Sequence, residues 1–153
     1  MRSFLVCAAA ALALAGCAKS DLSPVHVVQA TSSNDAAAAA SLISAYRVSR
    51  GLSPVTVDPR LNEAAAYQAR VVAAAGRLSH GDFSQRMREF GIVGYAAENL
   101  SAGTAQVGEA VNQWKTSPAH NENLLLPQAR RIGLARADAK GGYGRYWALV
   151  LGQ

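Results

Sequence analysis

The feature that most constrains the fold is an apolar run near the C-terminus, residues 146–151, which reads Tyr-Trp-Ala-Leu-Val-Leu. Apolar residues occupy odd and even positions alike, which is typical of a strand covered on both faces. A second strand is predicted over 131–138, and the Ala-Lys-Gly-Gly segment at 139–142 supplies a turn between the two. The sequence therefore predicts an antiparallel sheet in which the last strand is central.

Helix signals precede these strands. The predicted helices begin at Asn34 or Asp35, Pro59, Ser84 and Ala105, and end near residues 50, 75, 90 and 116. Asp58-Pro59 is a strong start, because the carboxylate can accept bonds from free N–H groups and proline suits the first helical position. Gly51 and Gly76 are suitable stops. Helices first and strands last predict an α+β fold, either helices on an antiparallel sheet or a three-layer sandwich.

The first residues have the pattern of an export signal. Arg2 precedes an apolar run over 4–15 that is too short to span a bilayer, and the run ends in Leu-Ala-Gly-Cys17. This ending resembles the lipobox of bacterial lipoproteins, which implies a signal peptide over 1–16, cleavage before Cys17 and lipidation of Cys17. The alternative is an ordinary secretory signal followed by a coincidental cysteine. Residues 17–33 lack a helical period and are predicted to be a flexible tether.

Cysteine usage and charge narrow the function classes. Cys7 lies in the signal and Cys17 would be acylated, so the mature domain has neither a disulfide nor a thiol ligand. The net charge is +5, but the basic residues are scattered and only Arg130 and Arg131 are adjacent. A nucleic-acid site needs a basic stripe with aromatic residues between the charges, so the sequence predicts no nucleic-acid partner.

Three side chains combine ligand or acid–base character with apolar surroundings. They are His80 in a loop after a helix, Glu98 within Ala-Ala-Glu-Asn-Leu, and His120 on a turn after the Ser-Pro pair at 117–118. Two imidazoles and a carboxylate suit zinc or a similar divalent cation. The alternatives are a loop histidine beside Asp82, a buried carboxylate bonded to backbone N–H groups, and a histidine that caps a helix C-terminus.

These motifs resemble, in their order, the bacterial branch of the CAP superfamily, the cysteine-rich secretory, antigen five and pathogenesis-related proteins with an SCP domain. The motifs are Leu-Ser-His80, Ala-Glu-Asn-Leu at 97–100, Trp114 followed by Ser-Pro-Ala-His120, Ile-Gly-Leu-Ala at 132–135, and the closing Tyr-Trp strand. The resemblance covers about residues 36–152 and implies a CAP domain over 34–153. The implied fold is a three-layer α-β-α sandwich around a central antiparallel sheet.

The resemblance also implies a site. The family has a cleft tetrad of two histidines and two acidic residues, which holds a divalent cation in some members. His80, Glu98 and His120 match three of the four, and Asn99 would brace Glu98 or the local backbone. The second acid is missing, because 115–119 hold no carboxylate. Glu109 and Glu122 are not at the matching place.

Three functions remain open at this stage. The first is a binding module on the bacterial cell envelope, held by a lipid at Cys17, that presents the His80, Glu98 and His120 cleft to a lipid, cell-wall or protein ligand. Ala18 after the cysteine resembles the outer-membrane pattern, facing the periplasm, if the host is Gram-negative. The second is a divalent-metal-dependent, peptidase-like hydrolase with the same three residues as catalytic groups. The third is a structural polar network that fixes the loops.

Overall fold

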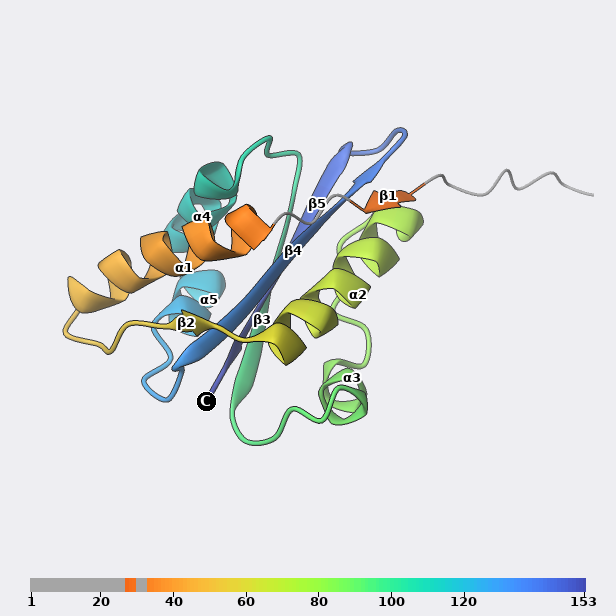
Figure 1. The fold of residues 1–153 in the computed structure, drawn as a ribbon. Coiled ribbons are helices and arrows are strands. Elements are labelled where there is room, and N and C mark those ends of the chain that lie inside the picture. Colours follow the sequence, from red (N-terminus) through yellow and green to blue (C-terminus); the bar gives the residue numbers. More distant parts are fainter. Residues whose placement is uncertain (1–26, 30–32) are drawn as a thin grey trace, which may run out of the picture.

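The run predicted to be a central strand forms β5, Arg145–Gly152. β5 pairs antiparallel with β4, Arg131–Ala139, on one side and with β3, Ala96–Ala102, on the other. The computed structural model describes residues 27–29 and 33–153, and Figure 1 shows its sheet nearly edge-on between helices. The prediction of a central last strand is therefore confirmed.

Two short strands complete the five-stranded sheet. β1, Val27–Gln29, pairs antiparallel with β4, and β2, Thr56–Val57, pairs parallel with β4. The sheet is antiparallel along β1, β4, β5 and β3, as predicted, and the two-residue β2 adds one parallel pair at its side. β1 lies within the segment predicted to be a flexible tether, so three of those residues belong to the edge of the sheet.

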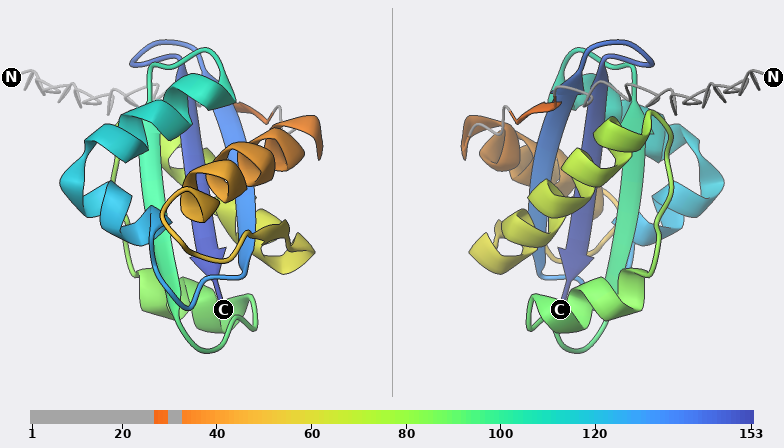
Figure 2. Two further views of the ribbon diagram at one scale, coloured as in Figure 1. Left: turned by 90° about the vertical axis from the view of Figure 1, so that its left-hand side faces the viewer. Right: turned by 90° about the vertical axis from the view of Figure 1, so that its right-hand side faces the viewer.

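Helices cover both faces of the sheet (Figure 2). α1, Ser33–Val48, α4, Val107–Thr116, and α5, Pro118–Leu124, lie on one face. α2, Pro59–Ala75, and α3, Phe83–Glu89, lie on the other. The three-layer α-β-α sandwich is confirmed.

The two faces of the sheet hold separate hydrophobic clusters, because alternate side chains of a strand point to opposite faces. Trp147, Leu149 and Leu151 of β5 pack with the α1 and α4 side, whereas Tyr146, Ala148 and Val150 pack with α2. α2 approaches the sheet closely over Gly133, where a Cβ would lie 1.9 Å from the backbone of Leu61. Both clusters are built from residues 36–151, so we expect 27–153 to fold as an independent unit.

The helix boundary signals are largely confirmed. Asp58 accepts bonds from the N–H groups of Arg60 and Leu61 at the start of α2, and Gly76 ends α2 in the left-handed conformation. α1, α3 and α4 begin and end within two residues of the predicted limits. Leu61, Ala65, Gln68, Ala69 and Val72, the predicted inner face of α2, are all buried.

Two predictions of local structure are wrong. The segment 96–102, which was not predicted to be a strand, is β3. His120 lies in α5 and not on a turn, because Pro118 ends α4 and also occupies the first turn of a new helix.

The predicted signal peptide over 1–16 and the lipidated Cys17 lie outside the described residues. Within the described ranges, no helix has both the length and the apolar character to cross a bilayer.

Candidate functional site

Glu98 is the centre of the candidate site. Glu98 lies within β3 and is only 5% exposed. Both of its carboxylate oxygens have partners on the face of the sheet that α2 and α3 cover. Oε1 lies 2.8 Å from Nδ1 of His80, and Oε2 accepts a 2.5 Å bond from Nη2 of Arg86. The structure therefore joins His80 and Glu98, as the sequence predicted, and adds a buried arginine.

Arg86 is held in turn by α2 and by the loop that carries His80. Its Nη1 donates to Oε1 of Gln68 at 2.6 Å and to the backbone oxygen of His80 at 3.0 Å. Gln68 also donates to the backbone oxygen of Ser79. The sequence analysis did not assign Arg86 or Gln68 to the site. The available signal was the polar side chain of Gln68 on the otherwise apolar inner face of α2.

His120 reaches the same strand from the opposite layer. Nδ2 of Asn99 donates to the backbone oxygen of His120 at 2.9 Å. Asn123, one turn further along α5, donates to Oδ1 of Asn99 and to the backbone oxygen of Glu98. Asn99 therefore braces α5 at His120, and it makes no side-chain bond to the Glu98 carboxylate among the described contacts.

The electrostatics of the site follow from its burial. Burial raises the pKa of Glu98 above its usual value, and the contacts with His80 and Arg86 oppose that shift. Burial also lowers the pKa of His120, and the charge of His80 lowers it further. His120 is therefore predominantly neutral at pH 7, as a metal ligand or a proton acceptor must be.

A groove of about 320 Å³ runs past His120 along β3. Its lining is mainly apolar, and it includes Leu78, Leu100, Trp114 and Tyr143 beside His120. Leu78 is 44% exposed and Tyr143 is 62% exposed, so both side chains are accessible to a ligand. Trp114 is fully buried and donates its indole N–H to the backbone oxygen of Leu100, which fixes this wall.

Glu109 and Glu122, the two acids nearest in sequence to the missing fourth position, do not complete a tetrad. Glu109 accepts bonds from the N–H groups of Ala105 and Gln106, and so it caps α4. Glu122 is an exposed residue of α5. Among the residues that the structure describes, no group of three or more His, Cys, Asp or Glu side chains is arranged to hold a metal ion.

The fold and the site together define a three-layer α-β-α sandwich in which a buried acid, Glu98, holds an exposed histidine, His80, near an open groove. The model of the cysteine-rich secretory protein family, named CAP, matches residues 40–151. This match spans most of the chain, and the chain belongs to the CAP family. No curated protein sequence matches the chain significantly.

Solved bacterial structures share this fold. The chain is similar to an outer surface protein of Borrelia burgdorferi, with 21% identity, a TM-score of 0.72 and coverage of 82% of this chain and 97% of that one. An extracellular SCP-domain protein of Bacillus anthracis has 19% identity and a TM-score of 0.69, over 78% of this chain and 40% of that one. The CAP domain of enterococcal PrgA has 14% identity and a TM-score of 0.62, over 78% and 60%.

Proposed function

We propose that this chain is an exported CAP-domain protein, anchored to the cell envelope by a lipid at Cys17, whose groove beside His120 binds a lipid, cell-wall or protein ligand. The observation that carries this proposal is that the Glu98 carboxylate already has partners for both of its oxygens. Both of its oxygens are engaged, one by His80 and the other by the buried Arg86, so the carboxylate is held in place and is not free for a catalytic role. The open, mainly apolar groove then supplies the contact area that a ligand needs.

Export of the chain rests on two supports. The N-terminal run ending in Leu-Ala-Gly-Cys17 resembles a lipoprotein signal. Two structurally similar CAP proteins are described as an outer surface protein and an extracellular protein. Cys17→Ala should move the protein from the membrane fraction to the soluble fraction. Unchanged fractionation would contradict lipidation at Cys17.

The groove can be tested with defined probes on residues 27–153. We expect either solubilised peptidoglycan fragments or a short-chain phosphatidylcholine to shift the indole N–H resonance of Trp114. Leu78→Asp should weaken this binding, because it places a charge on the apolar wall. Leu42→Asp is the matched control, since Leu42 is similarly exposed, at 39%, but lies on α1 outside the groove. Equal losses for both variants, or no shift with either probe, would contradict the groove assignment.

A specific contact also favours the alternative of a divalent-metal-dependent hydrolase. Glu98 holds Nδ1 of His80 and leaves Nε2 as the free ring nitrogen, which is how carboxylates orient metal-binding histidines. His80 and His120 would then be the ligands, with Glu98 behind His80, and the cation would supply an activated water. Direct coordination by Glu98 would require it to give up Arg86 or His80.

The metal alone tests this alternative. Zinc that binds the folded domain should raise its thermal midpoint, and His120→Ala should abolish the increase. If zinc, calcium and magnesium all leave the midpoint unchanged, the metal-dependent hydrolase is contradicted. If zinc raises the midpoint of His120→Ala as much as that of the wild type, the cation lies elsewhere.

A further inference from the structure

The loop between α3 and β3 presents apolar side chains to solvent at one end of the sandwich. Val93 is 83% exposed, the highest value for a large hydrophobic side chain among the described residues, and Tyr95 is 61% exposed. Gly91 and Gly94 take positive φ angles of 65° and 83° around Val93, so the loop projects as a tight turn. His120 lines a different hollow, to which neither Val93 nor Tyr95 contributes.

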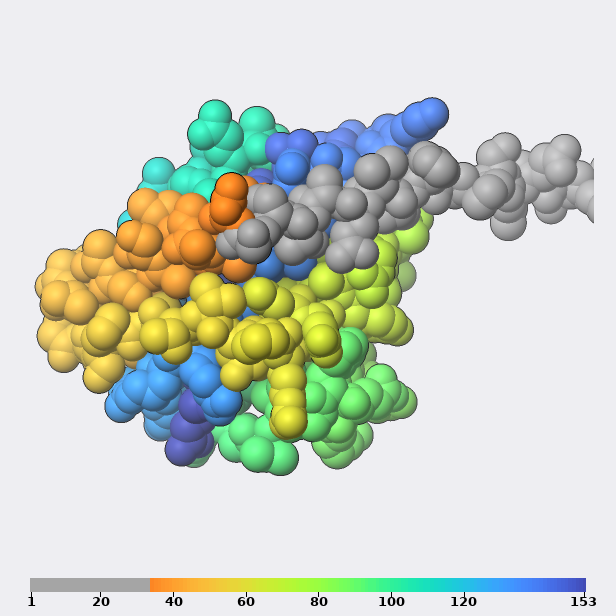
Figure 3. Space-filling model, viewed as in Figure 1, coloured from red at the N-terminus to blue at the C-terminus, as the bar shows by residue number. Residues whose placement is uncertain are grey.

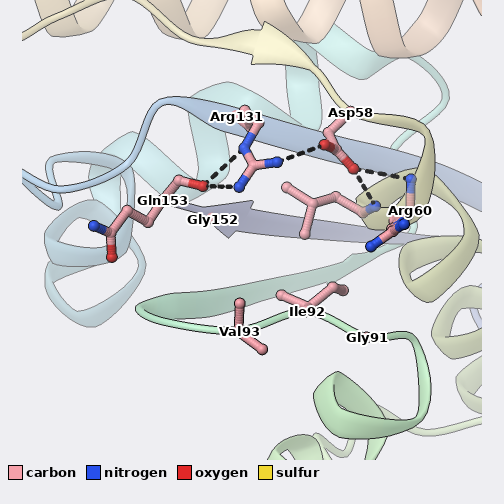
Figure 4. Close-up of a pocket in the computed structure, with 9 residues that line it drawn as sticks. Asp58, Arg60, Gly91, Ile92, Val93, Arg131, Gly152 and Gln153 are labelled. Carbon is pink, nitrogen blue, oxygen red and sulfur yellow. Dashed lines mark hydrogen bonds and ion pairs between the residues drawn. The ribbon is translucent and has the colours of Figure 1, made fainter.

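Arginines flank this loop on both sides. A hollow of about 150 Å³ is lined by Arg60, Leu61, Val93 and Arg131, with Val93 and Arg60 on opposite sides in Figure 4. A second hollow, of about 370 Å³, is lined on the other side of Val93 by apolar residues of α3 and by Arg88. Cations therefore surround the most exposed apolar tip.

Two of these cations are available to an external anion. Arg131 donates to Asp58 at 3.0 Å and to the backbone oxygen of Gln153, so its charge is already balanced (Figure 4). Asp58 has the only side-chain carboxylate that lines either hollow among the described residues. Arg60 and Arg88 make no side-chain hydrogen bond or ion pair within the described part of the chain.

We propose that this end docks on an anionic lipid bilayer, and we call Arg60, Arg88, Val93 and Tyr95 the docking end. Tyrosine prefers the membrane–water interface, and a small apolar tip gains by entering the acyl boundary. Arginines beside the tip then lie at the level of anionic headgroups. In Figure 3 the green segment around α3 and the dark blue end of the chain both lie at the bottom of the molecule, and the Gln153 N–H donates to the Tyr95 backbone oxygen.

We name a bilayer as the binding partner because of the proposed lipid anchor, so this inference rests on that part of the proposed function. Val27 lies ten residues after Cys17, so this length of chain can span at most about 35 Å. β4 pairs with Val27 at Ala139 and begins at Arg131, which lines the same hollow as Arg60 and Val93 of the docking end, so the length between them is about 27 Å. The anchor can therefore hold the docking end against the membrane that carries the lipid.

Vesicle sedimentation of unacylated residues 27–153 tests the proposal. The domain should bind vesicles of phosphatidylglycerol and phosphatidylethanolamine, bind phosphatidylcholine vesicles far less, and dissociate at high salt. Arg60→Gln and Arg88→Gln should each weaken binding about fivefold, and Val93→Asp should weaken it at least as much. The matched controls are Arg77→Gln and Val48→Asp, which change exposed residues away from the docking end.

Several results would overturn the proposal. They are equal binding to both kinds of vesicle, binding to neither, or equal losses in the control variants. Displacement by soluble glycerol phosphate alone would assign the arginines to a small-anion site instead. Binding to purified cell-wall sacculi, lost in the same variants and without vesicle binding, would assign this end to the cell wall. The domain in this assay carries no lipid, so failure here is distinguishable from failure of the Cys17 fractionation test.

Discussion

Replacing Arg86 with methionine tests whether the Glu98 cluster is a true buried ion pair. The side chains of Arg86 and Glu98 are 5% and 2% exposed, and their atoms lie 2.5 Å apart. Removing one partner of such a pair costs about 3–5 kcal/mol, because the other charge stays buried without compensation. For a domain of this size we expect the thermal midpoint to fall by about 10–20 °C. Arg88→Met, on the exposed side of the same helix, is the control and should have little effect.

A double-mutant cycle identifies the source of that loss. Glu98→Gln removes the charge that Arg86 compensates, so Arg86→Met should be less costly in the Glu98→Gln background. We expect the double variant to be more stable than the sum of the single effects by at least about 1.5 kcal/mol. Urea unfolding followed by tryptophan fluorescence measures each free energy of unfolding. Additivity within about 0.5 kcal/mol would refute the ion-pair argument.

The pH dependence supplies an independent check on the same variant. Burial raises the pKa of Glu98, and losing Arg86 removes one of the interactions that oppose the increase. A carboxyl group whose pKa is higher in the folded state stabilises the fold when protonated, and this stabilisation is lost as the pH rises through the folded pKa. The deficit of Arg86→Met should therefore be smaller at about pH 5 than at about pH 7.5. An equal deficit at both values would refute the reasoning.

Three further predictions follow from single contacts. The pKa of His120, measured by NMR of its imidazole, should lie below 6.5, and a higher value would contradict the effect of burial. In His80→Ala this pKa should rise only in part, because burial is the larger cause of the shift. Arg47→Met should cost at least about 3 kcal/mol in urea unfolding, because the fully buried guanidinium satisfies four backbone oxygens, one after α1 at Ser53 and three at and after the end of α5. A small loss would show that water replaces it. Gly133→Ala should prevent α2 from packing and abolish cooperative unfolding, whereas Gly108→Ala, with a nearest atom at 4.0 Å, should be tolerated.

Local signals were sufficient for the helices and the central strand. The cap at Asp58 and the left-handed Gly76 act within one turn of α2, so the sequence predicts both limits. β5 is apolar on both faces, and this property depends only on its own residues. Elements of this kind are predictable because the interactions that define them lie within the segment itself.

Elements that depend on a partner were not predicted. β3 contains Ala, Glu, Asn and Ser, which have low strand propensity, and it is held by pairing with β5 from Ala96 to Ala102. β2 has two residues, and it exists through its parallel register with β4. Arg86 was not predicted to belong to the site for the same reason, because its partner Glu98 lies on another element, twelve residues away. A buried polar residue shows that a partner is needed, but sequence spacing does not identify it.

The consecutive positions of Glu98 and Asn99 explain how the site is assembled. Neighbouring side chains of a strand point to opposite faces, so Glu98 bonds to His80 and Arg86 in the α2 and α3 layer while Asn99 bonds to His120 and Asn123 in the α5 layer. β3 lies at the end of the strand order, so both layers can extend past it toward each other. One dipeptide therefore fixes the positions of two histidines from different layers. A one-residue shift in the β3 register would exchange the two faces and separate both histidines from their partners, which makes the pairing of Glu98 with Val150 a condition for the site.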